Sequence, residues 1–170
     1  MKKLLLATSA ALAVMSAAAP VQAATVSGNF NVTVTLTSVC TMAAIGNLAF
    51  GTYIAFQTTA KTATNTTATL TCTRGLGGVT AAFDTNALIG STGAATATNA
   101  VGAGVISGLQ YDILGTAGTV VPGLAATSTS IGTGDSRPYT ISGNMQAGQA
   151  GTCSTTSCAA TQVRTLTVTY

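Results

Sequence analysis

The residues with the most definite chemistry in this sequence are its four cysteines, Cys40, Cys72, Cys153 and Cys158. Cysteines can hold a metal ion or form disulfides, and their spacing and compartment decide between the two. They are separated by 31, 80 and 4 other residues, and the sequence has no CxxC motif and no histidine. This pattern disfavours a metal site, and the even count favours two disulfides. Of the three possible pairings we favour Cys40–Cys72, which ties the start of the domain to a later strand, and Cys153–Cys158, which closes a short loop.

Side chains that could transfer protons or attack a substrate are scarce. The chain has no histidine and no glutamate, and its three aspartates, Asp84, Asp112 and Asp135, lie far apart in the sequence. We expect Asp112 to point outward, opposite to its neighbour Tyr111, and Asp135 to lie in a turn. The segment Gly102-Ala103-Gly104 is only a fragment of a nucleotide-binding fingerprint. The sequence therefore predicts a protein that is not an enzyme and needs no cofactor.

The first 23 residues have the pattern of a secretory signal peptide. Lys2 and Lys3 precede an apolar run, and Val21 and Ala23 occupy the −3 and −1 positions of a cleavage site after Ala23. The run covers 16 residues, 4–19, fewer than the roughly 20 that span a bilayer. We predict no membrane span in the mature chain. That chain has four basic and three acidic residues, a net charge of 4 − 3 = +1, which predicts no binding to nucleic acid.

The clearest periodicity follows the predicted cleavage site. Threonine, serine or asparagine alternates there with apolar residues or glycine, which are Val26, Gly28, Phe30, Val32, Val34 and Leu36. Strict alternation is typical of a β-strand with one apolar face. The segment is about twice as long as a typical strand, and no turn signal divides it.

Shorter strand-like segments follow, and no window after the leader has helical spacing. They cover residues 48–53, 66–73, 79–83, 108–114, 139–145 and 163–170. Turn-rich stretches separate them at 75–78, 89–104, 115–134 and 147–152. Many short strands with such connections predict an all-β sandwich or barrel. Charged residues are only 5% of the chain, so copies of it would repel one another little, which suits a protein that assembles.

The order of several motifs resembles the spore coat protein U domain family, the pilin fold of archaic chaperone–usher pili. Each motif is weak alone, but the resemblance spans nearly all of the mature sequence and begins with the alternating segment before Cys40. The other motifs follow it in order. They are Leu48-Ala49-Phe50-Gly51-Thr52-Tyr53, similar to an FGxY element; Leu70-Thr71-Cys72-Thr73-Arg74-Gly75; Leu109-Gln110-Tyr111; Arg137-Pro138-Tyr139-Thr140-Ile141-Ser142-Gly143; and Leu166-Thr167-Val168-Thr169-Tyr170. The pair Cys153 and Cys158 departs from the family's usual pattern, and we interpret it as a local staple before the last strand.

The resemblance implies a fold and a mode of assembly. The fold is an incomplete immunoglobulin-like β-sandwich that lacks its last strand, with domain bounds 1–23 for the signal peptide, 24–34 for an N-terminal donor strand and 35–170 for the pilin domain. Residues 35–40 would form the domain's own first strand. The donor side chains would be Val26, Gly28, Phe30, Val32 and Val34, and the acceptor edge would carry Leu166, Val168 and Tyr170.

The resemblance also implies partners and a location. A periplasmic chaperone and an outer-membrane usher would assemble copies of the chain into a surface pilus that supports adhesion and biofilm formation. The protein would pass through the periplasm and end at the cell surface.

Three alternatives remain at this point. The alternating segment could be an ordinary first strand that folds back on its own domain. The protein could be a secreted coat or matrix protein of the same fold that needs no usher. It could also be a monomeric ligand-binding sandwich, for which Tyr53, Tyr111 and Tyr139 are the candidate contacts, although each is better interpreted as a core residue.

Overall fold

The computed structural model describes residues 24–84 and 99–170. The predicted signal peptide, residues 1–23, lies outside the described residues. The chain divides into two units, residues 1–35 and 36–170. In the described part of the first unit, residues 24–35, no strand or helix is present and the side chains are exposed. The second unit contains all the strands described below.

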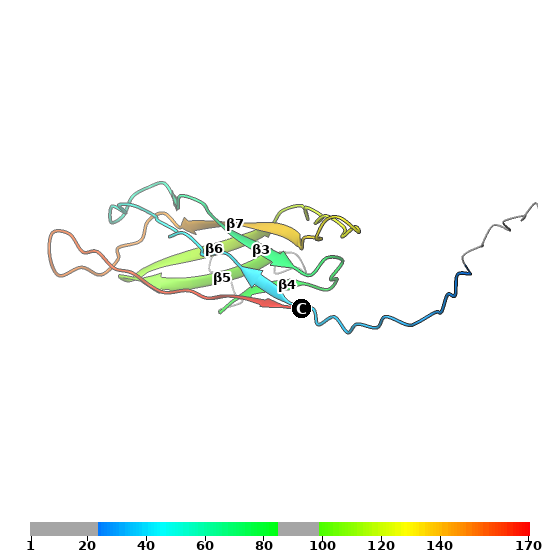
Figure 1. The fold of residues 1–170 in the computed structure, drawn as a ribbon. Coiled ribbons are helices and arrows are strands. Elements are labelled where there is room, and N and C mark those ends of the chain that lie inside the picture. Colours follow the sequence, from blue (N-terminus) through cyan, green and yellow to red (C-terminus); the bar gives the residue numbers. More distant parts are fainter. Residues whose placement is uncertain (1–23, 85–98) are drawn as a thin grey trace, which may run out of the picture. The chain divides into compact units, whose positions relative to one another are not determined.

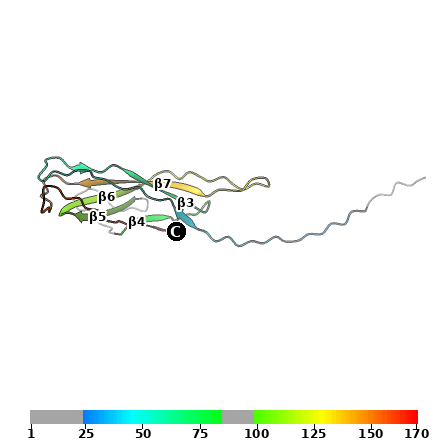
Figure 2. The ribbon, with the colours of Figure 1, turned by 60° about the vertical axis from the view of Figure 1, so that its left-hand side comes forward.

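The second unit is all-β, as the sequence predicted, and its described residues contain no helix. Its strands are β1 (Cys40–Met42), β2 (Lys61–Thr62), β3 (Thr66–Cys72), β4 (Thr80–Phe83), β5 (Asn99–Ile106), β6 (Leu109–Ala117), β7 (Asp135–Met145) and β8 (Leu166–Thr169). The larger sheet has the order β1-β3-β7-β6-β5, with β2 also pairing with β7, and the smaller sheet is β4-β8. Figure 1 shows the ribbon with these labels, and Figure 2 shows it turned by 60°. Every strand pair is antiparallel.

Strand β7 organises the larger sheet because it pairs with β3 along one edge and with β6 along the other. Its alternation is the one the sequence predicted, since Tyr139, Ile141, Gly143 and Met145 are buried and the residues between them are less so. Gly143 leaves room for the ring of Phe50, because a Cβ at position 143 would lie 2.7 Å from Phe50 Cζ.

The two sheets share one core, which is what makes the fold a sandwich. Phe83 of β4 and Leu166 of β8 belong to the same buried cluster as Tyr111 and Tyr139 of the larger sheet. Tyr139 is completely buried. The contact is close, since a Cβ at Gly115 of β6 would lie 3.3 Å from the Phe83 ring.

Two predicted strands are corrected by the structure. The domain's first strand is Cys40–Met42 and not residues 35–40, because the ladder with β3 starts at the Cys40–Cys72 pair. Residues 48–53 form no strand, and only an isolated bridge joins Ala49 to Thr64.

Strand β5 was missed because its sequence is rich in glycine and alanine. The stretch 89–104 was predicted to be turn-rich; residues 89–98 lie outside the described residues, and 99–104 belong to β5. Small residues are needed there, since a Cβ at Gly104 would lie 2.5 Å from the Tyr111 ring and 2.7 Å from a guanidinium nitrogen of Arg164. Close packing, and not flexibility, explains this glycine.

The predictions for two aspartates were wrong. Asp112 is only 3% exposed, because β6 is covered on both faces at this point and Tyr111, Asp112 and Ile113 are all buried. Asp135 is the first residue of β7 and does not lie in a turn. Alternation predicts an outward side chain only where one face of a strand meets solvent.

Candidate functional site

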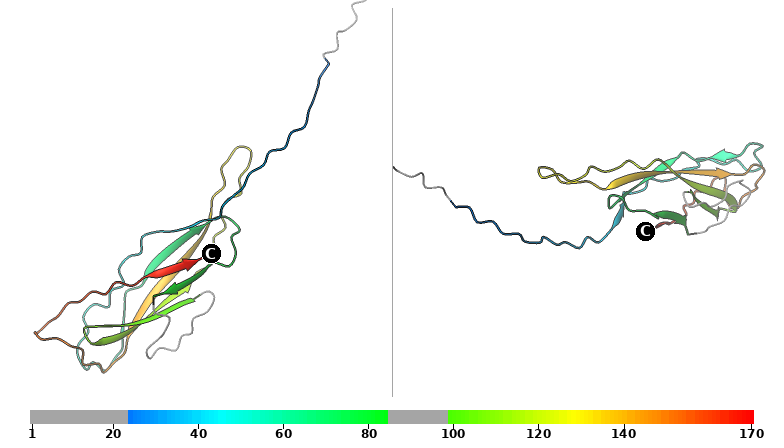
Figure 3. Two further views of the ribbon diagram at one scale, coloured as in Figure 1. Left: turned by 90° about the horizontal axis from the view of Figure 1, so that it is seen from below. Right: turned by 90° about the vertical axis from the view of Figure 1, so that its right-hand side faces the viewer.

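The candidate site is the outer edge of β8, where the smaller sheet stops. β8 pairs with β4 from Thr169–Thr80 to Leu166–Phe83, and within residues 24–84 and 99–170 no strand pairs with its other edge. Figure 3 shows β8 in red beside β4. An unpaired edge presents backbone N–H and C=O groups that can accept a further strand. Of the predicted acceptor residues, Leu166 is buried, Val168 is half-buried, and Tyr170 follows the strand and is 54% exposed.

Arg164 fixes the chain just before β8. Two nitrogens of its guanidinium contact the carboxylate of Asp84, with Nη2–Oδ1 at 2.7 Å and Nε–Oδ1 at 2.9 Å. Its Nη1 donates to the carbonyl of Ala103 at 2.6 Å and to the hydroxyl of Tyr111 at 3.0 Å. One side chain thus joins the approach to β8 with the end of β4 and with both β5 and β6. Burial alone would lower the pKa of Arg164, but hydrogen bonds to Asp84 and Tyr111 outweigh it and raise the pKa, so the charge is permanent.

A cavity of about 270 Å³ lies at the end of the sandwich where β3 ends and β4 begins. Its walls are mainly apolar and come from β3, from the segment leading into β4, from Val120 and from the first residues of β7. They are Leu70, Cys72, Leu76, Gly77, Gly78, Val79, Thr80, Val120, Asp135, Ser136 and Arg137. Because Thr80 pairs with Thr169, the cavity lies at the same end of the domain as the last residues of β8.

Several residues that pack against the core from the ends and edges of the sandwich are only half-buried. Half-buried apolar residues of β1, of β8 and of the segment before β4 pack against the core cluster, namely Met42, Val168, Leu76 and Val79. In the middle of the larger sheet, Ala68, Ile113 and Tyr139 are almost completely buried. Val168 and Met42 thus keep part of their apolar surface exposed at β8 and at β1.

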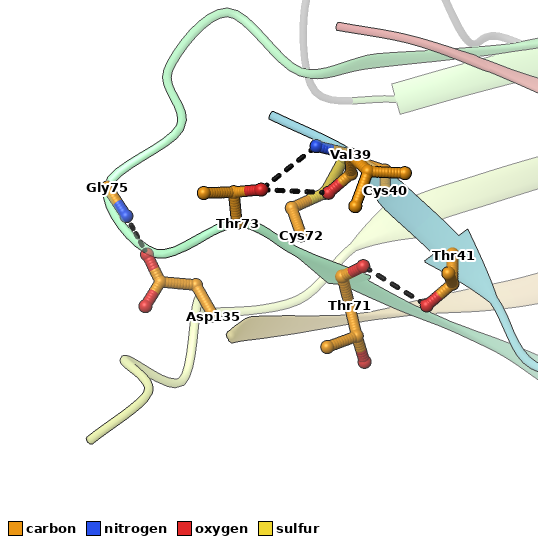
Figure 4. The surroundings of a disulfide bond; sticks show 8 residues. All are labelled: Val39, Cys40, Thr41, Thr71, Cys72, Thr73, Gly75 and Asp135. Atoms are coloured by element: carbon orange, nitrogen blue, oxygen red, sulfur yellow. Dashed lines mark hydrogen bonds between the residues drawn. A yellow bond between two sulfur atoms is a disulfide. The ribbon is translucent and has the colours of Figure 1, made fainter. Parts of the chain in front are cut away.

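The first disulfide lies at the same end of the domain as the cavity, because Cys72 is one of the residues that line it. Figure 4 shows the surroundings of this disulfide. Cys40 and Cys72 are bonded to each other and face each other across the β1–β3 ladder. Just before β1, Val39 donates to Thr73 Oγ1 at 2.9 Å, and its carbonyl accepts from Thr73 N at 2.9 Å. The second disulfide joins Cys153 and Cys158 in an exposed loop. Both disulfides are the pairs favoured from the sequence, and they leave no cysteine sulfur to bind a metal ion.

Asp135 organises the turn next to this disulfide. Its carboxylate accepts hydrogen bonds from Gly75 N at 2.8 Å and from Gly123 N at 2.7 Å. The N–H of Gly75, and then that of Gly123, hold the pKa of Asp135 below its usual value. The carboxylate is therefore charged at neutral pH and joins the loop after β3 to the connection between β6 and β7.

The predicted donor residues lie in the first unit. The side chains of Val26, Phe30, Val32 and Val34 are between 85% and 99% exposed, and the space around Gly28 is open. Such exposure of large apolar side chains on one short segment is costly in water. Their alternation is intact, but no strand includes them in the described chain.

Sequence reasoning gave no role to Arg164, Asp84 or Asp135. A usable signal existed, because residues 24–170 include only seven charged side chains, four basic and three acidic. In so neutral a protein, a charge next to a strand end is worth examining as a structural contact.

The described ranges contain no group of three or more His, Cys, Asp or Glu side chains placed to bind a metal ion. Likewise, no helix in the part of the chain that the structure describes is long and apolar enough to cross a membrane. Comparison with protein-family models, with curated proteins and with solved structures found no match for this chain.

Proposed function

We propose that this protein is an exported structural subunit of a surface fibre, assembled by donor-strand complementation. In this proposal residues 24–34 of one copy add to the β8 edge of the next copy. One observation carries it: the chain has both an exposed apolar segment with strand periodicity and a strand edge that no described residue pairs with. Addition of an extended segment to an open sheet edge is a common mode of recognition between proteins.

The donor segment has the chemistry that the open side requires. Four large apolar side chains, Val26, Phe30, Val32 and Val34, alternate with polar residues, so one face can enter the core while the other meets water. At about 1.5–3 kcal/mol for each, their burial supplies on the order of 10 kcal/mol before the cost of ordering. Backbone hydrogen bonds to β8 would add to this.

The cavity where β4 begins, at the end of the domain that also holds the last residues of β8, fits the same proposal. Its volume of about 270 Å³ exceeds the roughly 150 Å³ of an apolar cavity that binds benzene. It is smaller than the roughly 300–1,000 Å³ of pockets that take drug-sized ligands. We infer that it receives one apolar side chain of the donor, and Phe30 is the only aromatic residue within 24–34.

The sequence resemblance supplies the wider context of the proposal. The chain would belong to the spore coat protein U domain family, with an immunoglobulin-like fold whose last strand comes from a neighbour. A periplasmic chaperone would cover the β8 edge until an outer-membrane usher exchanges it for the donor strand. The disulfides fit an oxidising compartment, and the fibre would serve adhesion and biofilm formation.

Deletion of residues 24–34 tests the proposal. After periplasmic expression with the cognate chaperone and usher, we expect the full chain to form a ladder of SDS-resistant polymers and the deletion variant to form none. The matched control keeps the length and replaces Val26, Phe30, Val32 and Val34 by threonine, and it should also form none. Long SDS-resistant polymers from the deletion variant would refute donor-strand assembly.

The two other functions have less support. For a ligand-binding sandwich, the three tyrosines would have to face a site, but Tyr139 is buried and Tyr111 donates to Gln162 and accepts from Arg164. Tyr53 donates to the carbonyl of Gln146 and accepts from Gln149 N. A coat or matrix protein of the same fold would need no usher, so genes for a chaperone and an usher beside this one would distinguish it from a pilus subunit.

A further inference from the structure

The connection between β6 and β7, residues 118–134, forms an ordered arm whose role the assembly mechanism leaves open. Val121 and Ser136 exchange backbone hydrogen bonds of 2.7 and 2.9 Å. Further out, Thr133 N donates to the Leu124 carbonyl at 2.9 Å, and Thr127 N donates to the Ser130 carbonyl at 2.9 Å, which closes the tip. The arm is therefore a hairpin held by its own hydrogen bonds.

The arm presents apolar side chains and no charge. Val121, Leu124 and Ile131 are 61%, 71% and 92% exposed, and no residue from 118 to 134 is charged. Single exposed apolar residues are common on protein surfaces, but three on one projecting, uncharged hairpin are typical of a contact surface. The mature chain is nearly neutral, so charge repulsion would not oppose a contact with a second copy.

The base of the arm is fixed at the end of the domain where the chain enters the fold. Arg74 Nε donates to the Gly123 carbonyl at 3.1 Å, and the Asp135 carboxylate accepts from both Gly123 N and Gly75 N. Strand register places Cys40, Cys72 and Asp135 at one level of the sheet. Figures 1 and 3 show the arm, in yellow-green, projecting at the same end as the start of β1.

The reach of the arm matches the reach of the segment that would connect two copies. From Val121, which pairs with Ser136, to the tip at Thr127 there are 127 − 121 = 6 residue steps, or about 20 Å of extended hairpin. From Cys40 back to Val34, the end of the proposed donor, there are 40 − 34 = 6 steps, which also extend to at most about 20 Å. A neighbour that holds residues 24–34 thus lies within reach of the arm.

We propose that the 118–134 arm packs its apolar residues on the neighbouring copy that holds the same chain's residues 24–34. The inference rests on the proposed function and deepens it, because it assigns a second contact at each junction. The donor strand joins two copies, and the arm fixes the angle between them. The partner is a second copy of this chain, recognised by an apolar, uncharged contact.

The first test is photo-cross-linking within assembled polymers. p-Benzoylphenylalanine replaces Leu124 on the arm or, as the matched control, Thr140, which is exposed in the middle of β7. We expect irradiation to give covalent subunit pairs from position 124 that peptide mapping assigns to two different copies, with little product from position 140. Equal yields from both positions, or no product from position 124, would overturn the proposal.

The second test separates this inference from the proposed function. The double variant Leu124→Ser/Ile131→Ser should give the same SDS-resistant ladder as the unmodified chain, but electron micrographs should show fibres with a wider spread of angles between subunits. A normal ladder with unchanged fibres would contradict the proposed arm contact but would be consistent with donor-strand assembly. If the unmodified chain gives no ladder at all, the proposed function fails, and this inference fails with it.

Discussion

Residues 24–34 and strand β8 have the same kind of sequence but different structures. Both alternate apolar residues with threonine or another small polar residue. β8 is hydrogen-bonded to β4, and Leu166 on its inner face is buried. In residues 24–34, which are not part of any strand, Phe30 is 86% exposed.

The difference shows that alternation fixes which face of a segment is apolar but not where the segment pairs. β8 pairs with β4 of its own domain. The side chain of Arg164, which forms an ion pair with Asp84, also holds the chain just before β8. If residues 24–34 pair with a second copy, their apolar side chains should matter for assembly, and those of β8 should matter for the folding of each copy.

The largest effect should come from Phe30→Ser. We expect this substitution to abolish most SDS-resistant polymers, because it removes the bulkiest donor side chain, and to leave the unfolding temperature of the monomer unchanged. Gel analysis of polymers and thermal unfolding of the monomer measure the two properties separately.

Leu166→Ala is the matched change on β8. It should destabilise the monomer itself by about 2–5 kcal/mol, since it opens a cavity in the core. If Phe30→Ser destabilised the monomer as strongly as Leu166→Ala, residues 24–34 would be a strand of their own domain, and the contrast between the two segments would disappear.

The next largest effect concerns the disulfide where the chain enters the domain. Replacing Cys40 and Cys72 together by alanine should lower the free energy of unfolding by about 3–4 kcal/mol, because a loop with a sequence separation of 32 is released. Urea unfolding of the monomer measures this loss.

The control is the double alanine variant of Cys153 and Cys158, which releases a loop with a sequence separation of only 5. It should lose about 2 kcal/mol by the same argument. Equal losses from the two variants would show that the first disulfide has no special role in the domain.

Arg164→Leu should lower the stability of the folded domain, because it frees the chain just before β8. The variant loses the ion pair to Asp84 and the hydrogen bonds to Ala103 and Tyr111, and the Arg164 side chain is only 13% exposed. We expect a loss of about 2 kcal/mol in urea unfolding, in the range of hydrogen bonds that involve a charged group.

Arg74→Leu serves as the control for Arg164→Leu. Arg74 is exposed and donates one hydrogen bond, to the Gly123 carbonyl, so the cost should be below about 1 kcal/mol. A similar cost for both arginines would mean that β8 does not depend on its anchor.

The smallest effect is a pH dependence that comes from Asp135. The Gly75 and Gly123 N–H groups hold the pKa of Asp135 in the folded state below its unfolded value. The resulting stabilisation is therefore present above the unfolded pKa, about 4, and is lost as the pH falls through the folded pKa. Asp135→Asn should remove this component.

Urea unfolding of both proteins between pH 2 and pH 7 measures the difference. The unmodified chain should gain slightly more stability than the variant as the pH rises from acid to neutral. A larger gain in the variant would contradict the folded-state role of this carboxylate.

The sequence predicted the strands in which bulky apolar side chains alternate with polar ones. β3, β6, β7 and β8 each lie within or overlap a predicted segment, because bulky apolar residues such as Leu70, Tyr111 and Ile141 alternate there with polar ones. β5 was not predicted, since Gly104 is needed for its close approach to Tyr111 on the next strand and to Arg164, which lies 164 − 104 = 60 residues further along the chain.

The candidate site was predictable only in part. The alternation in 24–34 and at the end of the chain is visible in the sequence, and so is the cysteine count. The link between Arg164 and Asp84, 80 residues apart, and the burial of Asp112 depend on which strands become neighbours. No local pattern contains that information, so sequence reasoning left these residues without a role or misplaced them.

The Cys40–Cys72 bond also determines how a domain would carry tension. If a force acts on the chain at residue 36, the Cys40–Cys72 disulfide lies only 40 − 36 = 4 residues further along. This bond transfers the force from β1 to β3. β3 is paired with β7 through seven residue pairs, whereas β1 is paired with β3 through only three. The covalent bond thus keeps the short first strand attached to β3 even when its few backbone hydrogen bonds break.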